Sequence, residues 1–373
     1  MVKSGYKQTE IGVIPEDWEV NELGNIGNVN TGMTPATNNR NFYGEEYYFV
    51  SPSDLGKGKY ILNSEKKLSK LGFSIARKYP KNSILFTCIG STIGKAGISL
   101  FELTSNQQIN AVLPNDLYSS DFVYYFLTFI SPKIKLGASE QAVPMINKTE
   151  FSKTQIPLPP LAEQQAIAEA LSDADAWIES LEQLIAKKRL LKQGAMQELL
   201  TPKEDWEVRK LGEVLQFGSG KDYKHLSIGD IPVYGTGGIM TMVNDYLYDG
   251  ESVGIGRKGT IDKPVFLKGK FWTVDTLFFS HSFSNTLPKY IYYQFLQIPW
   301  KEYNEASGVP SLNKKTLEQI EISMPSITEQ TRIAAILSDM DLEIETFEKQ
   351  LEKARQIKQG MMQELLTGRI RLV

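Results

Sequence analysis

Two glycine-rich stretches hold the residues best suited to bind a phosphate or a nucleotide. Gly90-Ser91-Thr92-Ile93-Gly94-Lys95-Ala96 contains the glycines and the lysine of a phosphate-binding loop. It has one residue too few between the glycines, and Ala96 stands where a Ser or Thr would hold magnesium. Gly254-Ile255-Gly256-Arg257-Lys258-Gly259 resembles a dinucleotide fingerprint, but it lacks the strand–helix context and the later acidic residue. We therefore expect the first stretch to be a tight turn between strands, and neither stretch to bind a nucleotide.

The chain offers few side chains for nucleophilic, acid–base or metal chemistry. Its single cysteine, Cys88, excludes a disulfide framework and a cysteine-rich zinc site, and it indicates a reducing compartment. The two histidines, His225 and His281, both lie in the second half of the chain without counterparts in the first. The sequence has no Gly-x-Ser-x-Gly, no His-Glu-x-x-His and no Asp/Asn-Pro-Pro-Tyr/Phe tetrapeptide, the last being typical of amino-group methyltransferases. These features favour a binding protein without a metal or cofactor of its own.

The composition indicates a folded protein and does not by itself point to DNA. With 41% hydrophobic and 23% charged residues, the chain can bury a core. No apolar run approaches the ~18 residues of a membrane span, and the N-terminus lacks the apolar segment of a secretory signal. The formal net charge of −3 gives no reason to infer nucleic acid. We expect a cytoplasmic protein with no membrane partner.

The chain repeats itself, with three blocks returning in the same order. The repeated blocks are 15–20 and 203–208, 163–175 and 329–341, and 192–201 and 358–367. A weaker echo links Val143-Pro144 and Asn147-Lys148 to Val309-Pro310 and Asn313-Lys314. The first copy is the longer one, and the basic stretch 57–70 is where we expect its extra residues. The chain is therefore two tandem copies of a globular part followed by a helical part.

Each helical part carries an unbroken heptad seam. The seam residues are Ile167, Leu171, Ala174, Ile178, Leu181 and Ile185 in the first copy, and Ile333, Leu337, Met340, Ile344, Phe347 and Leu351 in the second. A 3.5-residue period kept over this length predicts a coiled coil, and two such helices in one chain most simply pair with each other. Lys192 and Lys358 fall on equivalent seam positions, where we expect their ammonium groups to reach out to solvent.

The globular parts consist of short apolar runs broken by turn residues, which predicts short strands joined by glycine-rich loops. The predicted fold class is α+β, with two globular domains of mixed short strands and helices. Two long helices that form an antiparallel coiled coil separate these domains, and the chain has an internal pseudo-two-fold repeat. The predicted boundaries are 1–158 and 202–324 for the globular domains, and 159–201 and 325–373 for the helical regions.

Taken together, the blocks resemble the specificity (S) subunit of type I restriction–modification systems, over essentially the whole chain. The resemblance rests on Thr9-Glu10-Ile11-Gly12-Val13-Ile14-Pro15-Glu16-Asp17-Trp18, on Ile156-Pro157-Leu158-Pro159-Pro160-Leu161-Ala162-Glu163-Gln164, and on Lys192-Gln193-Gly194 with Met196-Gln197-Glu198-Leu199-Leu200-Thr201. It implies two target-recognition domains, each reading one half of a bipartite site on double-stranded DNA. The coiled coil would then fix the gap between the half-sites and dock the modification subunits.

The resemblance also assigns the catalytic activities to partner subunits. It implies modification subunits that bind S-adenosylmethionine and restriction subunits that hydrolyse ATP, with magnesium expected in the partners as well. This chain would then be a non-catalytic recognition subunit without a cofactor. Two other hypotheses remain open at this stage, namely a coiled-coil interaction scaffold without DNA specificity and a stand-alone nuclease or methyltransferase with an unrecognised site.

Loop residues that could contact DNA are polar or basic, because such side chains read base edges and bind phosphates. The candidates in the first domain are Thr31, Thr34, Ser51, Ser53, Lys57, Lys59, Ser91, Thr92 and Lys95. Those in the second domain are Ser219, Lys221, Lys224, His225, Tyr234, Thr236, Arg257 and Lys258. Arg257 is the strongest single candidate, because Arg most often reads guanine with two hydrogen bonds and this one follows a glycine-rich turn.

Overall fold

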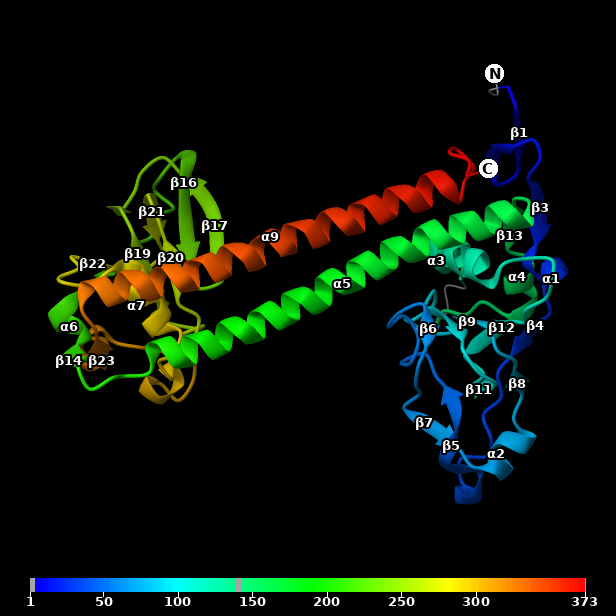
Figure 1. The fold of residues 1–373 in the computed structure, drawn as a ribbon, viewed down its shortest axis with the longest axis horizontal. Coiled ribbons are helices and arrows are strands. Elements are labelled where there is room, and N and C mark those ends of the chain that lie inside the picture. Colours follow the sequence, from blue (N-terminus) through cyan, green and yellow to red (C-terminus); the bar gives the residue numbers. More distant parts are fainter. Residues whose placement is uncertain (1–3, 139–142, 373) are drawn as a thin grey trace. The chain divides into compact units, whose positions relative to one another are not determined.

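The computed structural model describes residues 4–138 and 143–372, which form two compact units (Figure 1). Unit 1 comprises Met1–Leu181 and Gln350–Val373, and unit 2 comprises Glu182–Lys349. Each unit contains one mixed α/β domain and one segment of each of two long helices, α5 (Leu161–Leu200) and α9 (Ile327–Leu365). None of the helices described here is both long and apolar enough to cross a membrane.

The domain of unit 1 is built on two sheets with the strand orders β4-β12-β9-β10-β6 and β7-β5-β11-β8. The first sheet holds β4 (Val29–Thr31), β12 (Ile109–Val112), β9 (Ile84–Thr87), β10 (Ala96–Ser99) and β6 (Tyr60–Ile61). The second holds β7 (Lys66–Leu68), β5 (Tyr43–Val50), β11 (Leu103–Ser105) and β8 (Lys78–Tyr79). Two strand pairs accompany them: β1 (Tyr6–Thr9) with β2 (Gly12–Pro15), and β3 (Glu19–Glu22) with β13 (Gln155–Leu158). The helical segments are α1 (Leu23–Ile26), η1 (Arg40–Phe42), α2 (Lys70–Ile75), α3 (Ser120–Leu136) and α4 (Lys148–Ser152).

The domain of unit 2 repeats this plan with the strand orders β15-β22-β19-β20 and β17-β16-β21-β18. The first sheet holds β15 (Gln216–Ser219), β22 (Leu277–His281), β19 (Ser252–Gly256) and β20 (Val265–Leu267). The second holds β17 (Gly238–Val243), β16 (Ile228–Gly235), β21 (Lys270–Thr273) and β18 (Tyr248–Asp249). The pair β14 (Glu207–Lys210) with β23 (Glu321–Met324) matches β3 with β13. The helical segments are α6 (Leu211–Val214), α7 (Pro288–Phe295), η2 (Trp300–Tyr303) and α8 (Lys314–Gln319).

The repeat seen in the sequence is therefore a repeat of topology, and the predicted α+β class with two domains is confirmed. In the second sheet of each unit, one central pair is parallel, β5 with β11 and β16 with β21, and the flanking pairs are antiparallel. Most of the extra residues of unit 1 fall between Val50 and Cys88, the interval that contains the predicted stretch 57–70. Strand β6 and helix α2 lie there, and unit 2, which is described throughout, has no counterpart of either.

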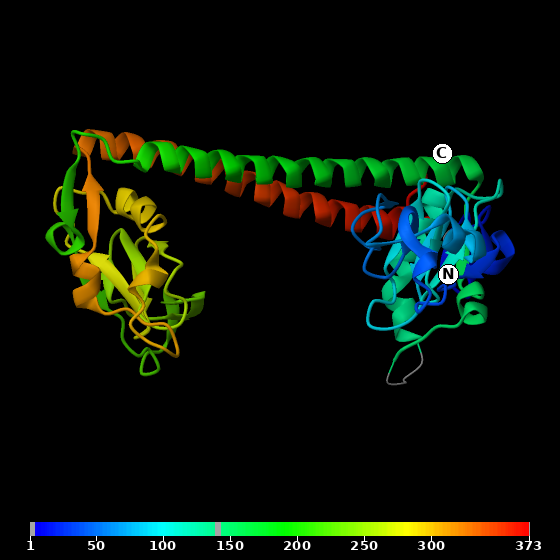
Figure 2. The same cartoon turned by 90° about the horizontal axis from the view of Figure 1, so that it is seen from below.

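Helices α5 and α9 pack side by side and antiparallel in both units, as Figures 1 and 2 show. In unit 1, Asp175 near the start of α5 meets Lys358 near the end of α9, and in unit 2 Lys192 meets Asp341. The predicted coiled coil is confirmed, and every one of its twelve seam residues is buried or half-buried. Ile167, Leu171, Ile333 and Leu337 are completely buried, because the aromatic helices α3 and α7 also cover these positions.

The expectation for the two seam lysines was wrong. The ammonium groups of Lys192 and Lys358 do not reach free into solvent, but bind the carboxylates of Asp341 and Asp175 on the opposite helix. Their side chains are 16% and 22% exposed, respectively. The heptad pattern identified these seam positions but gave no sign of the acidic partners, which lie 149 and 183 residues away in the sequence.

Candidate nucleic-acid interface

In each unit, one short turn joins the two sheets and collects the ends of several strands. In unit 1 this junction turn is 105–109, between β11 and β12. It is held by four backbone hydrogen bonds: Gly32 N to Ile109 O (2.9 Å), Met33 N to Ser105 O (2.9 Å), Asn106 N to Val50 O (3.0 Å) and Cys88 N to Gln108 O (2.8 Å). The segments that follow β4, β5 and β9 therefore meet at one edge of the domain.

The junction turn of unit 2, residues 273–277 between β21 and β22, is held by the equivalent four bonds. These run from Gly220 N to Leu277 O (3.2 Å), Lys221 N to Thr273 O (2.9 Å), Val274 N to Tyr234 O (3.0 Å) and Arg257 N to Thr276 O (2.7 Å). The backbone of the two junctions is thus the same, whereas their side chains differ. A shared frame that carries different exposed side chains is what two domains reading different partners require.

The candidates of unit 2 lie around its junction turn. Lys221, Tyr234 and Arg257 supply three of the four junction bonds, and Ser219, Thr236 and Lys258 flank them in the chain. Lys224 and His225 follow in the same loop as Lys221, and the His225 ring lies 5.8 Å from that of Trp272. The Trp272 indole N–H donates to the Lys221 carbonyl oxygen (2.8 Å), so the loop is anchored. Arg257 is exposed, with its guanidinium 5.8 Å from the centre of the Phe278 ring.

The unit 1 candidates divide between the junction turn and other places. Thr34 donates to Gln107 Oε1 in the turn (2.5 Å), and Thr31 donates to Asn110 Oδ1 on β12 just after it (2.7 Å). Ser51 and Ser53 belong to a turn in which Ser51 donates to the Asp54 carboxylate (2.7 Å). The remaining exposed or half-exposed candidates are Lys57, in the loop after that turn, and Ser91, Thr92 and Lys95, in the loop after β9.

Lys59 is engaged inside unit 1 rather than at its surface. Its side chain is 12% exposed, and its ammonium group lies 2.9 Å from Asp121 on α3 and 2.7 Å from Ser172 Oγ on α5. These contacts tie the globular domain of unit 1 to the long helix α5. The spacing of residues in the sequence could not separate this half-buried lysine from the exposed Lys57 two positions earlier.

Sequence reasoning missed the side chains at the tips of the junction turns. Gln107 and Asp275 occupy equivalent places there, and both are exposed. Glutamine suits adenine and aspartate suits the amino group of cytosine, so both belong among the candidate base-reading residues. Their only sequence signal was a polar stretch between two apolar runs, which many surface loops share.

The repeated segments Val143-Pro144 and Val309-Pro310 lie beside equivalent loops in the two units. The carbonyl oxygens of Pro144 and Pro310 accept hydrogen bonds from Gly90 N (2.8 Å) and Gly259 N (2.9 Å), respectively. Each Val-Pro segment therefore closes the loop that follows β9 or β19.

Neither glycine-rich stretch forms a nucleotide-binding element. Gly90 (φ 90°) and Gly94 (φ 100°) both adopt left-handed backbone conformations in the turn between β9 and β10, as expected for a tight turn. Gly254 and Gly256 lie inside β19, whose neighbours β20 and β22 are antiparallel to it. The parallel strand–helix–strand context of a dinucleotide site is therefore missing around β19.

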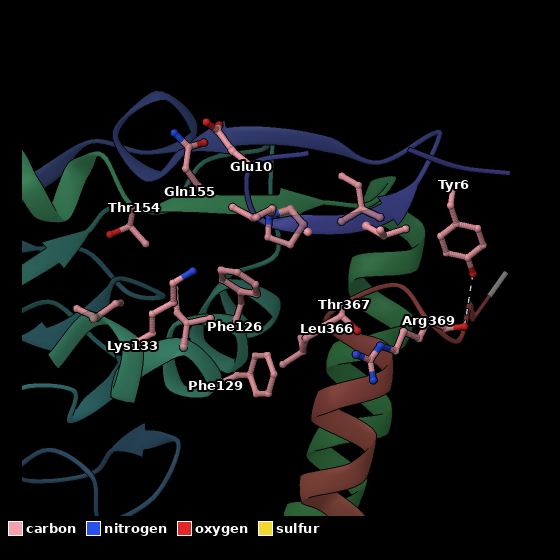
Figure 3. Close-up of a pocket in the computed structure, with 17 residues that line it drawn as sticks. Tyr6, Glu10, Phe126, Phe129, Lys133, Thr154, Gln155, Leu366, Thr367 and Arg369 are labelled. Atoms are coloured by element: carbon pink, nitrogen blue, oxygen red, sulfur yellow. Dashed lines mark hydrogen bonds between the residues drawn. The ribbon is translucent and has the colours of Figure 1, made fainter. Parts of the chain in front are cut away.

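A cavity of about 950 Å³ in unit 1 is shown in Figure 3. Its lining is mainly apolar and comes from the β1–β2 hairpin, α3, β13 and the residues just after α9. Its charged side chains, Glu10, Lys133 and Arg369, belong to three different elements.

Burial raises the pKa of the Cys88 thiol to about 12, so this thiol is not a ready nucleophile. Among residues 4–138 and 143–372, no cluster of three or more His, Cys, Asp or Glu side chains could hold a metal ion.

Comparison with known proteins finds the same family in both copies of the repeat. The sequence model of a family described as "Type I restriction modification DNA specificity domain" matches residues 15–188 and again residues 203–356. The chain belongs to this family. The two matches cover both recognition domains and most of both long helices, so the resemblance found in the sequence blocks is confirmed.

Relatives of known name agree with this assignment. The MjaVIII specificity subunit of Methanocaldococcus jannaschii is 26% identical and aligns over 96% of this chain and 94% of its own length. The MjaIX specificity subunit of the same organism is 28% identical over 58% of this chain, which spans about half (56%) of that relative's length. A crystal structure of a type I S subunit from M. genitalium has the same fold, with a TM-score of 0.67 and 19% identity over 93% of this chain and 96% of that one. The chain thus shares its sequence family with these relatives and its fold with that S subunit.

Proposed function

We propose that the chain recognises a bipartite site on double-stranded DNA, with each recognition domain reading one half-site through the edge that holds its junction turn. The observation that carries the proposal is the duplicated junction, which has the same four backbone bonds in both units and different exposed side chains. Exposed Lys221, Lys224 and Lys258 suit phosphates, while Arg257 and Asp275 suit a guanine and a cytosine edge. The half-sites should therefore differ in sequence.

The remaining roles follow from the type I class and are part of the same proposal. The two long helices fix the gap between the half-sites and dock the modification subunits, which bind S-adenosylmethionine, while restriction subunits hydrolyse ATP with magnesium. The chain itself is non-catalytic and carries no cofactor. A protein that acts on DNA together with these partners works in the cytoplasm.

A domain exchange tests the proposal. Residues 215–312 of unit 2 are replaced by the equivalent segment of a relative. These boundaries keep α6 and α8 together, since Gly212 on α6 packs against Glu318 on α8. The complex with modification subunits then selects sequences from a random duplex library. We expect one half-site to change and the other to persist, with the matching exchange in unit 1 as the reciprocal control.

Two results would favour the other hypotheses. If neither the parent nor the exchanged complex enriched any sequence, the scaffold hypothesis would replace DNA recognition. If the highly purified chain methylated or cut DNA without partners, with S-adenosylmethionine and magnesium supplied, the non-catalytic assignment would be wrong.

A further inference from the structure

A Tyr–Asp–Lys cluster joins three elements of unit 1. Tyr125 on α3 donates its hydroxyl proton to Asp175 Oδ2 on α5 (2.7 Å). The other carboxylate oxygen of Asp175 accepts from Lys358 Nζ on α9 (2.5 Å). The Lys358 ammonium also lies 5.5 Å from the centre of the Tyr125 ring. One carboxylate thus connects the recognition domain with both helices of the coiled coil.

The same cluster recurs in unit 2, with the helices exchanging roles. Tyr293 on α7 donates to Asp341 Oδ2 on α9 (2.7 Å), and Asp341 Oδ1 accepts from Lys192 on α5. Lys192 Nζ again lies 5.5 Å from the tyrosine ring centre. A serine accompanies each cluster at 3.2 Å from the tyrosine oxygen, Ser172 in unit 1 and Ser338 in unit 2. Two copies with this geometry on different domains indicate a shared structural requirement.

Apolar packing alone does not fix how each domain lies on the helix pair. The interfaces also contain apolar side chains that belong to one hydrophobic cluster in each unit, among them Phe122 and Ile167 in unit 1 and Tyr290 and Ile333 in unit 2. The hydrophobic effect is non-directional, so a small rotation of the domain on the helices loses little of the free energy of apolar burial. Charge-assisted hydrogen bonds are short and directional. The clusters therefore supply the angular constraint that the apolar contacts lack.

The position of the lysines adds a second constraint. Lys192 and Lys358 occupy seam positions of the coiled coil, and a polar residue in such a seam specifies the register of the helices. Burial raises the pKa of both Tyr125 and Tyr293 well above the usual range, so each hydroxyl keeps its proton and remains a donor. A slip of one helix along the other would separate each lysine from its aspartate. Register of the helices and orientation of the domain are thus set by one carboxylate in each unit.

We propose that the unit 1 cluster (Tyr125, Asp175, Lys358) and the unit 2 cluster (Tyr293, Asp341, Lys192) consist of positioning residues that set which gap between half-sites the protein accepts. This inference rests on the proposed reading of a bipartite site. The clusters lie between each domain and the two long helices and not at the junction turns, so we expect their loss to change the tolerance for gap length and to leave the sequence of each half-site unchanged.

The test compares gap preference in variants that keep the packing. The wild-type complex with modification subunits first selects its site from a random duplex library. Its affinity is then measured for duplexes whose gap is one or two base pairs longer or shorter. Tyr293→Phe and Lys192→Met break the unit 2 cluster, and Tyr125→Phe breaks that of unit 1. Tyr290→Phe is the matched control, because Tyr290 lies on the same helix and its hydroxyl donates within the domain, to Ser323 O (2.8 Å).

We expect the preference for the selected gap to fall about tenfold in Tyr293→Phe and Lys192→Met, since a hydrogen bond to a charged group shifts an equilibrium by roughly that factor or more. Tyr290→Phe should keep the wild-type preference. Lys192→Arg, which retains the charge, should restore most of the preference that Lys192→Met loses. Thermal melting of every variant shows whether it is folded. If the tyrosine variants melt early, the difference in gap preference between Lys192→Arg and Lys192→Met tests the inference instead.

Each other outcome has a definite meaning. An unchanged gap preference in Tyr293→Phe and Lys192→Met would overturn the inference, and so would an equal loss in Tyr290→Phe. A changed half-site sequence in either cluster variant would overturn it too, because the residue would then act inside the domain. Failure of the wild-type complex to select a bipartite site would instead refute the proposed function.

Discussion

Replacing Arg371 with Met should strongly destabilise unit 1, because this residue neutralises a buried carboxylate. Glu163 at the start of α5 is completely buried, and its carboxylate accepts from Arg371 Nε (2.6 Å), Arg371 Nη2 (2.8 Å) and the Trp18 indole N–H (3.0 Å). Arg371 also binds both oxygens of Asp17 (2.9 and 2.7 Å). The segment after α9 therefore closes unit 1 on its own N-terminal block.

The magnitude follows from the burial of Glu163. Removing one partner of a buried ion pair costs about 3–5 kcal/mol, and since Arg371 is 25% exposed, we take the lower end, ~3 kcal/mol. For a unit of about 200 residues, this lowers the melting temperature by roughly 6–12 °C. Asp17 is 51% exposed, so its share is below about 1 kcal/mol.

Unit 2 provides the matched control. Glu329 is the counterpart of Glu163, and it pairs with Arg332 one helical turn away at the surface, where the arginine is 50% exposed. Arg332→Met should therefore lower the melting temperature far less than Arg371→Met, because ion pairs at the surface contribute little to stability. Thermal unfolding followed by circular dichroism and calorimetry measures both variants. Equal melting temperatures for Arg371→Met and Arg332→Met would refute the reasoning, whereas added Glu163→Gln should recover part of the loss in Arg371→Met.

The effect of pH gives an independent check. The hydrogen bond from Arg371 holds the pKa of Asp17 below its usual value of 3.8. A carboxyl with a lowered pKa stabilises the folded state above its unfolded pKa, and this contribution is lost as the pH falls through the folded value. Wild type should therefore lose, below about pH 4, the small Asp17 contribution that Arg371→Met has already lost, so that the difference between their melting temperatures narrows in acid.

Three further predictions concern other parts of the chain. Cys88 is buried with a raised pKa, so maleimide labelling at neutral pH should be slow in the folded protein and should rise with denaturant as unit 1 unfolds; fast labelling of folded protein would contradict this. Arg257→Ala should cost ~1–3 kcal/mol at one base pair of one half-site, whereas an equal loss on every sequence in binding assays would make Arg257 a phosphate contact. Deleting one heptad from each long helix, residues 180–186 and 346–352, keeps the seam and shortens the pair by ~10 Å, about three base pairs. Library selection should then return a shorter gap or no bipartite site, and recovery of the original gap at full affinity would show that the helices do not set it.

The architecture could be predicted from the sequence because its signals are local or periodic. The heptad seam appears as spacing along one helix, and the matching blocks around Trp18 and Trp206 show that the unit is repeated. The glycines at 90 and 94 predicted a turn, since the backbone conformation they favour is a property of the single residue. The absence of the catalytic motifs could likewise be read from short stretches of sequence.

The contacts that position the candidate site depend on residues far apart in the chain. Gln107 and Asp275 become candidates only once the folded sheets place them at the tips of the junction turns. Lys59 could be separated from Lys57 only through its contact with α5.

The same holds for ion pairs. The sequence shows Lys192 and Lys358 as isolated charges in an apolar seam, and Arg371 as one of several basic residues near the C-terminus. Only the antiparallel packing of α5 and α9 brings aspartates to the two lysines, and only the closure of unit 1 brings Glu163 to Arg371, 208 residues away. Local sequence determines which element forms and which face is apolar, because these depend on backbone preference and spacing. The partner of a buried charge is decided by tertiary structure, because removing it from water is favourable only where an opposite charge is already held in place.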